Sequence, residues 1–249
     1  MIHSKNKLLL IPWLMGMFPL FVLAMATLAL GHLANVFASR IYYIALAWLD
    51  ENYHYIEWLR RDLADCETIL ELGCGSNSPI LKIGYGKRTD AIDIWHPYIK
   101  KHNKKGDYRN CWPYDVLEFD FPVKAYDAVV MFDVLEHLPA ERVREIDLFG
   151  KLERCAKKKI ILFTPNGYVE NDEIDGNPYQ AHLSAWQPED YKARGYKVLG
   201  GTGFRFFFVK ASCPKRPQSV FYPLGMISQP LVYHFPRLAL HSYAVKEIK

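Results

Sequence analysis

The chain has 249 residues, of which 50% are hydrophobic and 23% are charged. This composition excludes a disordered or collagen-like protein and leaves room for one large domain or two small ones. The net charge of +4 is too small to indicate nucleic-acid binding by itself. The five cysteines form no CxxC pair, which argues against a disulfide scaffold or a zinc site and fits a reducing compartment.

The first part of the chain is an uncharged hydrophobic run. From Leu8 to Ser39 there is no Asp, Glu, Lys or Arg, and Leu8–Leu30 as a helix would span about 34 Å, enough for the hydrocarbon layer. A buried core helix, a secretory signal and a retained membrane anchor are the open interpretations. We predict that residues 1–39 are membrane-associated. They form either a helix or a hairpin, because internal prolines and a glycine interrupt the run.

The C-terminal part is also rich in apolar side chains. Residues 217–236 carry several aromatic rings and almost no charge, and their prolines argue against a spanning helix. This segment either lies at a membrane interface or packs on the domain as a capping arm. We predict that residues 213–249 form an apolar arm, with a membrane-facing surface as one interpretation.

Residues 40–212 alternate predicted strands and helices. Predicted helices lie at 40–64, 140–156 and 188–194, and predicted strands lie at 67–72, 89–94, 112–116, 125–132, 159–164, 196–199 and 204–210. Gly200 and Gly201 are expected to join the last two strands as a hairpin. This alternation predicts an α/β domain with parallel strands and crossover helices.

A glycine turn and two acidic residues follow successive strands of this domain. Gly73 and Gly75 end the first strand, but no third glycine completes a dinucleotide fingerprint and no Lys-Ser/Thr completes a P-loop. Asp93 ends the second strand, where a carboxylate can bind two ribose hydroxyls. Asp115 follows near the end of the next strand, where it can accept from an exocyclic amine. This ordered set predicts an adenosine site.

The segments ILELGCGSN, AIDI, PYDV, YDAVVMFDVLEHLP and IILFTPNG, in this order, resemble class I S-adenosylmethionine-dependent methyltransferases of the ubiquinone-type O-methyltransferase kind. The resemblance covers roughly residues 66–210. It implies a Rossmann-like, seven-stranded, mostly parallel sheet with helices on both faces. It also implies S-adenosylmethionine as the cofactor.

The resemblance further implies which residues hold the cofactor. From the methionine end through the ribose and the adenine to the sulfonium, they are Glu71, Gly73, Cys74, Gly75, Asp93, Asp115, the Val116 amide and Phe132. Asn77 stands where many members of the family have a third glycine, so the details of this loop are expected to differ.

The candidate catalytic residues follow the fourth strand. A hydroxyl acceptor must lose its proton during methyl transfer, and His137 is the first choice for this task, ahead of His182 and Asp133. The pattern also resembles metal-dependent enzymes that methylate the 2′-hydroxyl at small-RNA 3′ ends, which implies Asp133, Glu136, His137 and His182 as ligands of a divalent ion. The alternative, which we favour, is that Glu136 and His137 cap the next helix without a metal.

The sequence therefore predicts an S-adenosylmethionine-dependent methyltransferase that acts on an oxygen of a lipophilic or membrane-linked acceptor. The catalytic domain is expected to face the cytoplasm, where its cofactor is made, and residues 1–39 are expected to contact membrane lipids. Nucleic acid is not an expected partner, because no RNA-binding module is recognised. A soluble acceptor (a sugar, a small acid or an RNA terminus) and a non-catalytic cofactor-binding subunit are the alternatives.

Overall fold

The computed structural model describes residues 54–169, 171, 176–210 and 213–248. The chain divides into two units, Met1–His54 and Tyr55–Lys249, and the described residues belong almost entirely to the second. The predicted membrane segment and most of the helix predicted at 40–64 therefore lie outside the described residues. The predicted domain limits at 39/40 and 212/213 stay predictions. Among the described helices, none has the length and apolar character that crossing a bilayer requires.

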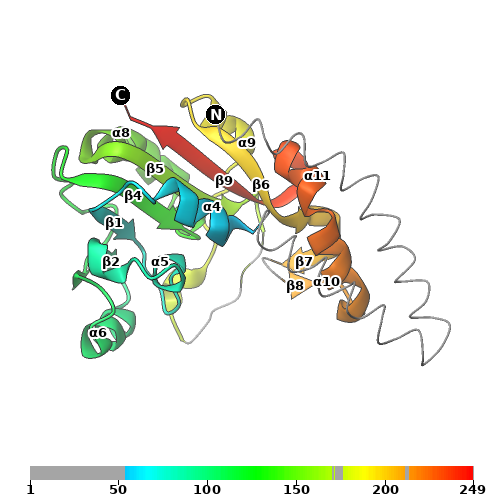
Figure 1. The fold of residues 1–249 in the computed structure, drawn as a ribbon, viewed down its shortest axis with the longest axis horizontal. Helices are drawn as coiled ribbons and strands as arrows, with labels where there is room; N and C mark the ends of the chain where they lie inside the picture. The colour runs from blue at the N-terminus through cyan, green and yellow to red at the C-terminus, as the bar shows by residue number, and fades with distance from the viewer. Residues whose placement is uncertain (1–53, 170, 172–175, 211–212, 249) are drawn as a thin grey trace. The chain divides into compact units, whose positions relative to one another are not determined.

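A seven-stranded sheet forms the centre of the second unit (Figure 1). Its strands are, in spatial order, β3 (Asn110–Pro113), β2 (Thr89–Asp93), β1 (Ile69–Leu72), β4 (Tyr126–Phe132), β5 (Ala156–Pro165), β9 (Ala239–Glu247) and β6 (Lys197–Phe204). The first five run parallel, and β9 is antiparallel to both of its neighbours. The predicted Rossmann-like, mostly parallel sheet is confirmed.

Helices connect these strands. They are α4 (Tyr55–Asp62), α5 (Pro79–Lys82), α6 (His96–Lys105), α7 (Ala140–Glu145), α8 (Leu148–Cys155), α9 (Pro188–Lys192), α10 (Gln218–Ile227) and α11 (Gln229–His234). The crossovers from β1 to β3 run across the sheet in one direction, and the crossover from β4 to β5 runs in the other. Because such crossovers are right-handed, the two sets of helices cover opposite faces of the sheet.

Alternate residues of the central strands pack on different helices. Leu162 of β5 and Ala244 of β9 belong to the apolar core that includes Leu152 of α8. Their neighbours Phe163 and Tyr243 contact α4 instead, through ring contacts with Tyr55 and Trp58 respectively. A sheet that is buried on both faces in this way explains why its strands are apolar throughout.

The C-terminal segment completes the sheet. β6 continues through Gly200 and Gly201, and its partner is β9. The predicted hairpin of 196–199 and 204–210 is therefore wrong, because the two glycines lie within one strand and the returning strand comes from the chain's end. Residues predicted as an apolar arm contain β9, which lies between β5 and β6.

The helix predicted at 140–156 is broken. α7 ends at Glu145, and Asp147 adopts a left-handed conformation with φ of 50°. Its carboxylate accepts a hydrogen bond from the Gly150 amide at 3.2 Å and so caps α8. The apolar spacing of this segment suits one long helix, but it does not reveal a single residue in the left-handed region.

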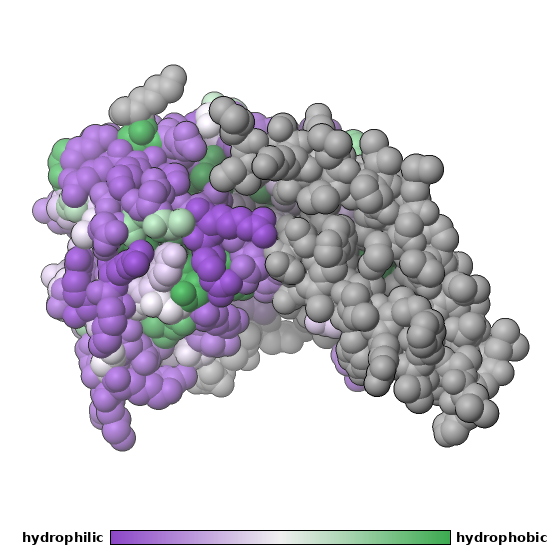
Figure 2. Space-filling model, viewed as in Figure 1, coloured by the Kyte–Doolittle hydropathy of each residue, from purple (hydrophilic) through white to green (hydrophobic). Residues whose placement is uncertain are grey.

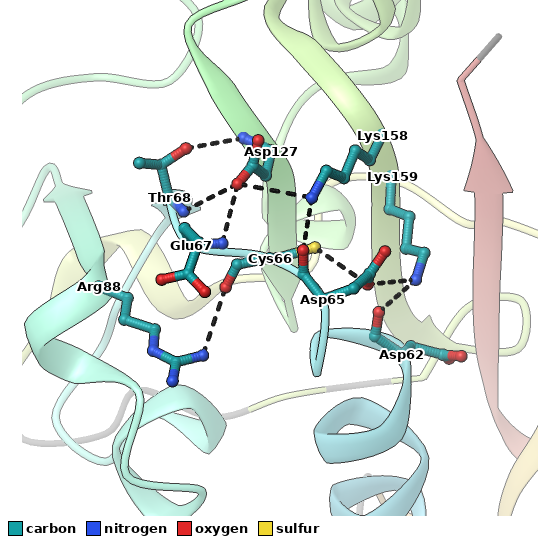
Figure 3. A network of polar contacts seen from close by, with 9 residues as sticks. All are labelled: Asp62, Asp65, Cys66, Glu67, Thr68, Arg88, Asp127, Lys158 and Lys159. Atoms are coloured by element: carbon teal, nitrogen blue, oxygen red, sulfur yellow. Dashed lines mark hydrogen bonds and ion pairs between the residues drawn. The ribbon is translucent and has the colours of Figure 1, made fainter.

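A polar network joins α4 to the amino ends of β1, β4 and β5 (Figure 3). Asp127 accepts hydrogen bonds from the amides of Glu67 and Thr68, at 2.8 and 3.3 Å. Lys159 donates to the Asp62 carbonyl and pairs with Asp65, both at 2.7 Å. These contacts lie at the opposite end of the strands from the cavity described below, so they hold the sheet together without taking part in the site.

Candidate active site

A cavity of about 570 Å³ opens at the carboxyl ends of β1, β2 and β4. The chain leaves β1 and β4 toward opposite edges of the sheet, and such a switch point is where doubly wound sheets bind ligands. The volume is in the range of cofactor sites. Predicted site residues in the lining are Gly73, Cys74, Gly75, Asp93, Asp115, Val116, Phe132, Asp133 and His137.

The two glycines at the end of β1 serve different purposes. Both have positive φ, +71° at Gly73 and +57° at Gly75, which glycine adopts without strain. A Cβ at Gly73 would lie 2.3 Å from Cγ2 of Val134, whereas no described atom lies within 4 Å of a Cβ at Gly75. Gly73 is thus required by packing. Gly75 leaves open space in the cavity wall, where a ligand can approach the backbone.

Asp93 is buried at the end of β2 and faces the glycine turn. Its Oδ2 accepts from the Gly75 amide at 2.8 Å, and its Oδ1 accepts from the Trp95 amide at 2.7 Å. Burial raises the pKa of this carboxyl, although the two amide hydrogen bonds and the nearby His102 oppose the shift. Each oxygen has a second acceptor site, so a fixed Asp93 can still bind two ribose hydroxyls.

His102, a residue that the sequence patterns did not single out, holds the same turn from behind. Its Nε2 lies 2.8 Å from the Gly75 carbonyl oxygen, and its Nδ1 lies 2.8 Å from Oδ2 of Asp107. The ring is almost completely buried and sits edge-on to Tyr108. His102 therefore positions Gly75 without lining the cavity.

Asp115 and Phe132, the residues expected to contact the adenine and the sulfonium, both line the cavity. Oδ1 of Asp115 accepts from the Leu117 amide at 2.8 Å, which fixes the half-buried carboxylate beside Val116. Phe132 is the last residue of β4 and forms part of the cavity wall. The structure thus brings both residues into one cavity with Asp93, as the adenosine prediction requires.

Glu71 does not line the cavity. Its carboxyl accepts hydrogen bonds from Ser78 Oγ at 2.5 Å and from Tyr108 OH at 2.8 Å, and its side chain is completely buried. Burial raises its pKa to about 8. Ser78 also accepts from the Ile80 amide as the cap of α5, so Glu71 supports the loop through Ser78.

Lys82 and Asp133 both line the cavity, and the charge of Lys82 acts on the Asp133 carboxyl. Asp133 has φ of 51° directly after β4, a strained conformation for a residue other than glycine. Its side chain is exposed and lines the cavity. Desolvation by the cavity wall raises its pKa to about 7, and the charge of Lys82 partly opposes the shift. No sequence pattern had singled out Lys82.

Glu136, His137 and His182 meet beside the cavity, although His182 lies far from the other two in sequence. Nδ1 of His137 donates to the Ala181 carbonyl at 3.1 Å, and Nδ1 of His182 donates to the Val169 carbonyl. A carbonyl can only accept, so each Nδ1 carries the proton and each Nε2 keeps its lone pair. Burial lowers the pKa of both rings, so both are neutral near pH 7.

These residues satisfy the basic requirements of a divalent-ion site. One ligand atom from each of the three lies within 4.8 Å of the others. Oε2 of the buried Glu136 has no hydrogen-bond partner within the described ranges. Burial raises the pKa of this carboxyl, and the negative charge of Asp133 raises it further. Histidines that donate Nδ1–H to a carbonyl and present Nε2 are typical metal ligands. Asp133, the fourth residue of the predicted set, is not part of this group.

The comparisons with known proteins agree with this geometry. Residues 70–162 match the family model of the methyltransferase domain. The match runs from β1 into β5, and this part of the chain is a class I S-adenosylmethionine-dependent methyltransferase domain. S-adenosylmethionine is therefore its cofactor. Three features fit that molecule: the open space at Gly75, the free acceptor site on each Asp93 carboxylate oxygen, and the cavity volume. No curated protein matches the chain in sequence.

Several solved structures are similar to this methyltransferase domain. A small RNA methyltransferase is 14% identical with a TM-score of 0.50, over 78% of this chain and 25% of its own, and supports the fold. A methyltransferase from Archaeoglobus fulgidus is 19% identical with a TM-score of 0.47, over 80% of this chain and 98% of its own. The magnesium protoporphyrin IX methyltransferase of Synechocystis, with bound SAH, is 14% identical with a TM-score of 0.46, over 88% and 90%.

Proposed function

We propose that this protein transfers the methyl group of S-adenosylmethionine to an oxygen of a lipophilic or membrane-linked acceptor. The observation that carries the proposal is that residues suited to the cofactor (Gly75, Asp93, Asp115) and a residue suited to proton transfer (His137) line one cavity. A catalytic base and a cofactor site must share a cavity if the acceptor oxygen is to meet the methyl group in line. A subunit that only binds the cofactor needs no such base.

His137 is suited to take the acceptor proton. Its Nδ1–H is engaged by the Ala181 carbonyl, so the lone pair for a proton is on Nε2. Its lowered pKa keeps this nitrogen neutral and able to accept at neutral pH. Aromatic and apolar side chains around the opening, Tyr179 and Leu183 among them, are exposed and fit a lipophilic acceptor.

A second candidate mechanism uses a divalent ion, and the unpartnered Oε2 of Glu136 favours it. Glu136, His137 and His182 would hold the ion, which would lower the pKa of an acceptor hydroxyl. The Nε2 lone pair of His137 can bind a proton or an ion, but not both. The two mechanisms are therefore exclusive alternatives for the same residue.

Membrane attachment through residues 1–39, with the domain facing the cytoplasm, remains part of the proposal. Its support is the uncharged run from Leu8 to Ser39. A carbonate wash of cell membranes tests it: the protein should stay in the membrane fraction, and release into the soluble fraction would contradict the attachment.

The acceptor is identified by mass spectrometry of lipid and polar extracts from cells with and without the protein. We expect a lipid-phase compound that gains one methyl group when the wild type is present and fails to gain it with His137→Gln. A methylated product found only among polar metabolites or RNA termini would favour the soluble-acceptor alternative. Unchanged methylation with His137→Gln and His182→Gln together would favour a non-catalytic subunit.

The role of Asp93 is tested separately by calorimetry with S-adenosylhomocysteine. Asp93→Ala should weaken binding by about 1.5–3 kcal/mol for each charge-assisted hydrogen bond to the ribose that is lost. The matched control is Asp120→Ala, an exposed acid outside the cavity, which should bind as the wild type does. Equal affinities of the Asp93 and Asp120 variants would refute the ribose assignment.

The metal alternative predicts a different result. A chelator should abolish methyl transfer, and added magnesium or zinc should restore it. Glu136→Gln should lose the bound ion, measured by elemental analysis of the purified protein, while cofactor affinity stays unchanged because Glu136 does not line the cavity. Full turnover in the presence of the chelator would exclude the metal and leave His137 as the base.

A further inference from the structure

The connection between β6 and β9 is much longer than the sheet requires. The two strands are antiparallel neighbours, which a short turn can join, yet residues 205–238 separate them. This insertion contains the 3₁₀ turns Arg205–Phe207 and Pro236–Leu238, the strand pair β7 (Phe208–Lys210) and β8 (Cys213–Pro214), and helices α10 and α11. Figure 1 shows these elements gathered beyond the end of β6, where α10 contacts β6 and β8.

Exposed apolar side chains concentrate on this insertion. More than half of the large hydrophobic side chains that are exposed in the described part of the chain belong to it. The most exposed are Phe206, Val209, Tyr222 and Phe235, with 63%, 62%, 54% and 55% of their surface accessible. By contrast, the described surface of the sheet domain is mostly hydrophilic in the view of Figure 2. Scattered apolar residues are common on surfaces, but such a concentration marks an interaction site.

The charge of the insertion has one sign. No Asp or Glu occurs from Tyr191 to Lys246, while the insertion carries Arg205, Lys210, Lys215, Arg216 and Arg237. The ammonium of Lys215 lies 3.7 Å from the centre of the Phe206 ring. Arg237 pairs with Glu189, and Arg205 donates to the carbonyls of Asn166 and Tyr168. Lys215 is the basic group placed against an exposed ring, and its charge complements an anionic surface.

We propose that the insertion docks onto an anionic phospholipid bilayer, with its aromatic rings at the level of the head groups. Exposed aromatic rings together with lysine and arginine are typical of the membrane interface. The aliphatic members Val209, Leu231 and Leu238 fit lipid better than nucleic acid, which is read by polar and aromatic groups. Lysine is depleted at the centre of protein interfaces, so Lys215 on Phe206 argues against a protein partner.

This docking surface rests on the proposed membrane location and adds a second contact to it. It would hold the far end of the sheet, β6 and β9, against the bilayer. A lipophilic acceptor could then reach the cavity without passing through bulk water.

The test uses the full chain with an environment-sensitive fluorophore on one introduced cysteine. Tyr222→Cys and Phe235→Cys report on the insertion, and Val123→Cys, which is 73% exposed outside it, is the matched control. Cys213→Ser is present in all three proteins, so that the dye labels the introduced cysteine. The remaining native cysteines, Cys66, Cys74, Cys111 and Cys155, are buried and react poorly. The labelled proteins are reconstituted into phosphatidylcholine vesicles with or without phosphatidylserine, and quenching by a head-group-labelled lipid is measured.

We expect quenching at positions 222 and 235 but not at 123, and only in vesicles that contain phosphatidylserine. Lys215→Gln and Arg216→Gln should each lower the ratio of docked to undocked protein about fivefold. Equal quenching at 123 and 235 would overturn the proposal. Equal quenching in vesicles with and without phosphatidylserine would overturn it as well. A blue-shifted fluorophore before vesicles are added would show that protein covers the surface and would overturn it too. Protein that stays unbound to the vesicles refutes the proposed membrane attachment, whereas bound protein without quenching at 222 and 235 refutes this docking surface alone.

Discussion

The acidic side chains of the site have few cations beside them. Burial raises the pKa of Glu71, Asp93 and Glu136, and desolvation raises that of Asp133, which is exposed to the cavity. Lys82 is the cation that opposes the shift at Asp133. S-adenosylmethionine brings a sulfonium and an α-ammonium, so its binding supplies the missing positive charge. Its α-carboxylate in turn needs a cation, and Lys82 is the basic side chain in the described cavity lining.

Lys82 is therefore expected to bind the α-carboxylate of the cofactor. Lys82→Met should weaken binding of S-adenosylhomocysteine by about 1.5–3 kcal/mol, because a charge-assisted hydrogen bond is lost. Binding of methylthioadenosine, which has no amino-acid end, should not change. Calorimetry with both ligands checks this, and Lys87→Met, on a basic residue outside the lining, is the control. An equal loss of affinity for both ligands would mean that Lys82 stabilises the loop and does not bind the carboxylate.

Sequence patterns could bring Gly75, Asp93 and Asp115 to one cavity because each lies at or just after the end of a strand. The strand predicted at 112–116 is observed as β3 at Asn110–Pro113, so Asp115 lies beyond it and not within it. His137 and His182 were also chosen from the sequence, and the structure places their ring centres 4.8 Å apart. Lys82 and His102 could not be found in this way. A single lysine or histidine on a short helix has no periodicity, and its contact with the site depends on how the loop folds back.

At the level of elements, the sequence predicts the strands that carry a local apolar pattern, but it does not predict the pairing of β9 with β6, which are far apart in the chain. The parallel strands β1, β2, β4 and β5 lie close to their predicted positions. β9 was missed, because its partner β6 is separated from it by the insertion and no local signal records that pairing. Gly200 and Gly201 suggested a turn. In the structure Gly200 instead lets β6 approach α11, since a Cβ there would lie 2.0 Å from the Val232 carbonyl oxygen.

Gly203 makes a similar contact between β6 and α10 and allows a matched test. A Cβ at Gly203 would lie 2.1 Å from the Gly225 carbonyl oxygen, whereas no described atom lies within 4 Å of a Cβ at Gly84. The φ angles are nearly equal, +80° and +79°. Gly84→Ala should lower the free energy of unfolding by about 1–2 kcal/mol, from backbone strain alone. Gly203→Ala should lower it further, because two backbones must separate.

Urea unfolding of both variants, followed by circular dichroism, measures the difference. The insertion should loosen first in Gly203→Ala, so the fluorophore at position 235 should detect an earlier transition than the far-ultraviolet signal of the sheet. Equal destabilisation of the two glycine variants would mean that α10 does not press on β6 as closely as the structure indicates.

Across the whole unit, acids at the two ends of the sheet differ in their partners. At the site, burial raises the pKa of Glu71, Asp93 and Glu136. At the amino ends of the strands, Asp65 has a lowered pKa because Lys159 donates to it, and Asp127 has a lowered pKa because the Glu67 and Thr68 amides outweigh burial. Asp65 and Asp127 therefore stabilise the amino ends of the strands through their partners, although burial raises the pKa of the neighbouring Asp62. Within the described residues, the acids at the site have no such cation and can be neutralised by a cationic cofactor.

Asp90 shows how the stabilising end responds to pH. Its carboxylate accepts from Arg109 Nε and Nη2 at 2.8 and 2.6 Å, from Asn110 at 2.8 Å and from Tyr126 at 2.9 Å. Burial alone would raise its pKa, but these bonds lower it below 3.8. Because the folded pKa is the lower one, the contribution to stability is complete above pH 3.8 and is lost as the pH falls through the folded pKa.

Asp90→Asn removes the charge and keeps the shape of the side chain. At neutral pH it should lower the free energy of unfolding by about 1.5–3 kcal/mol, since hydrogen bonds between charged groups are weakened. Below pH 3.8 the variant and the wild type should begin to converge, and they should meet once the pH is below the folded pKa, where the wild-type carboxylate is protonated in both states. Urea unfolding at neutral and acidic pH, with the exposed Asp120→Asn as the control, measures both quantities. A deficit that stays constant across this pH range would mean that Asp90 acts through packing, and that the charge pairing at the amino ends of the strands does not set the acid stability of the domain.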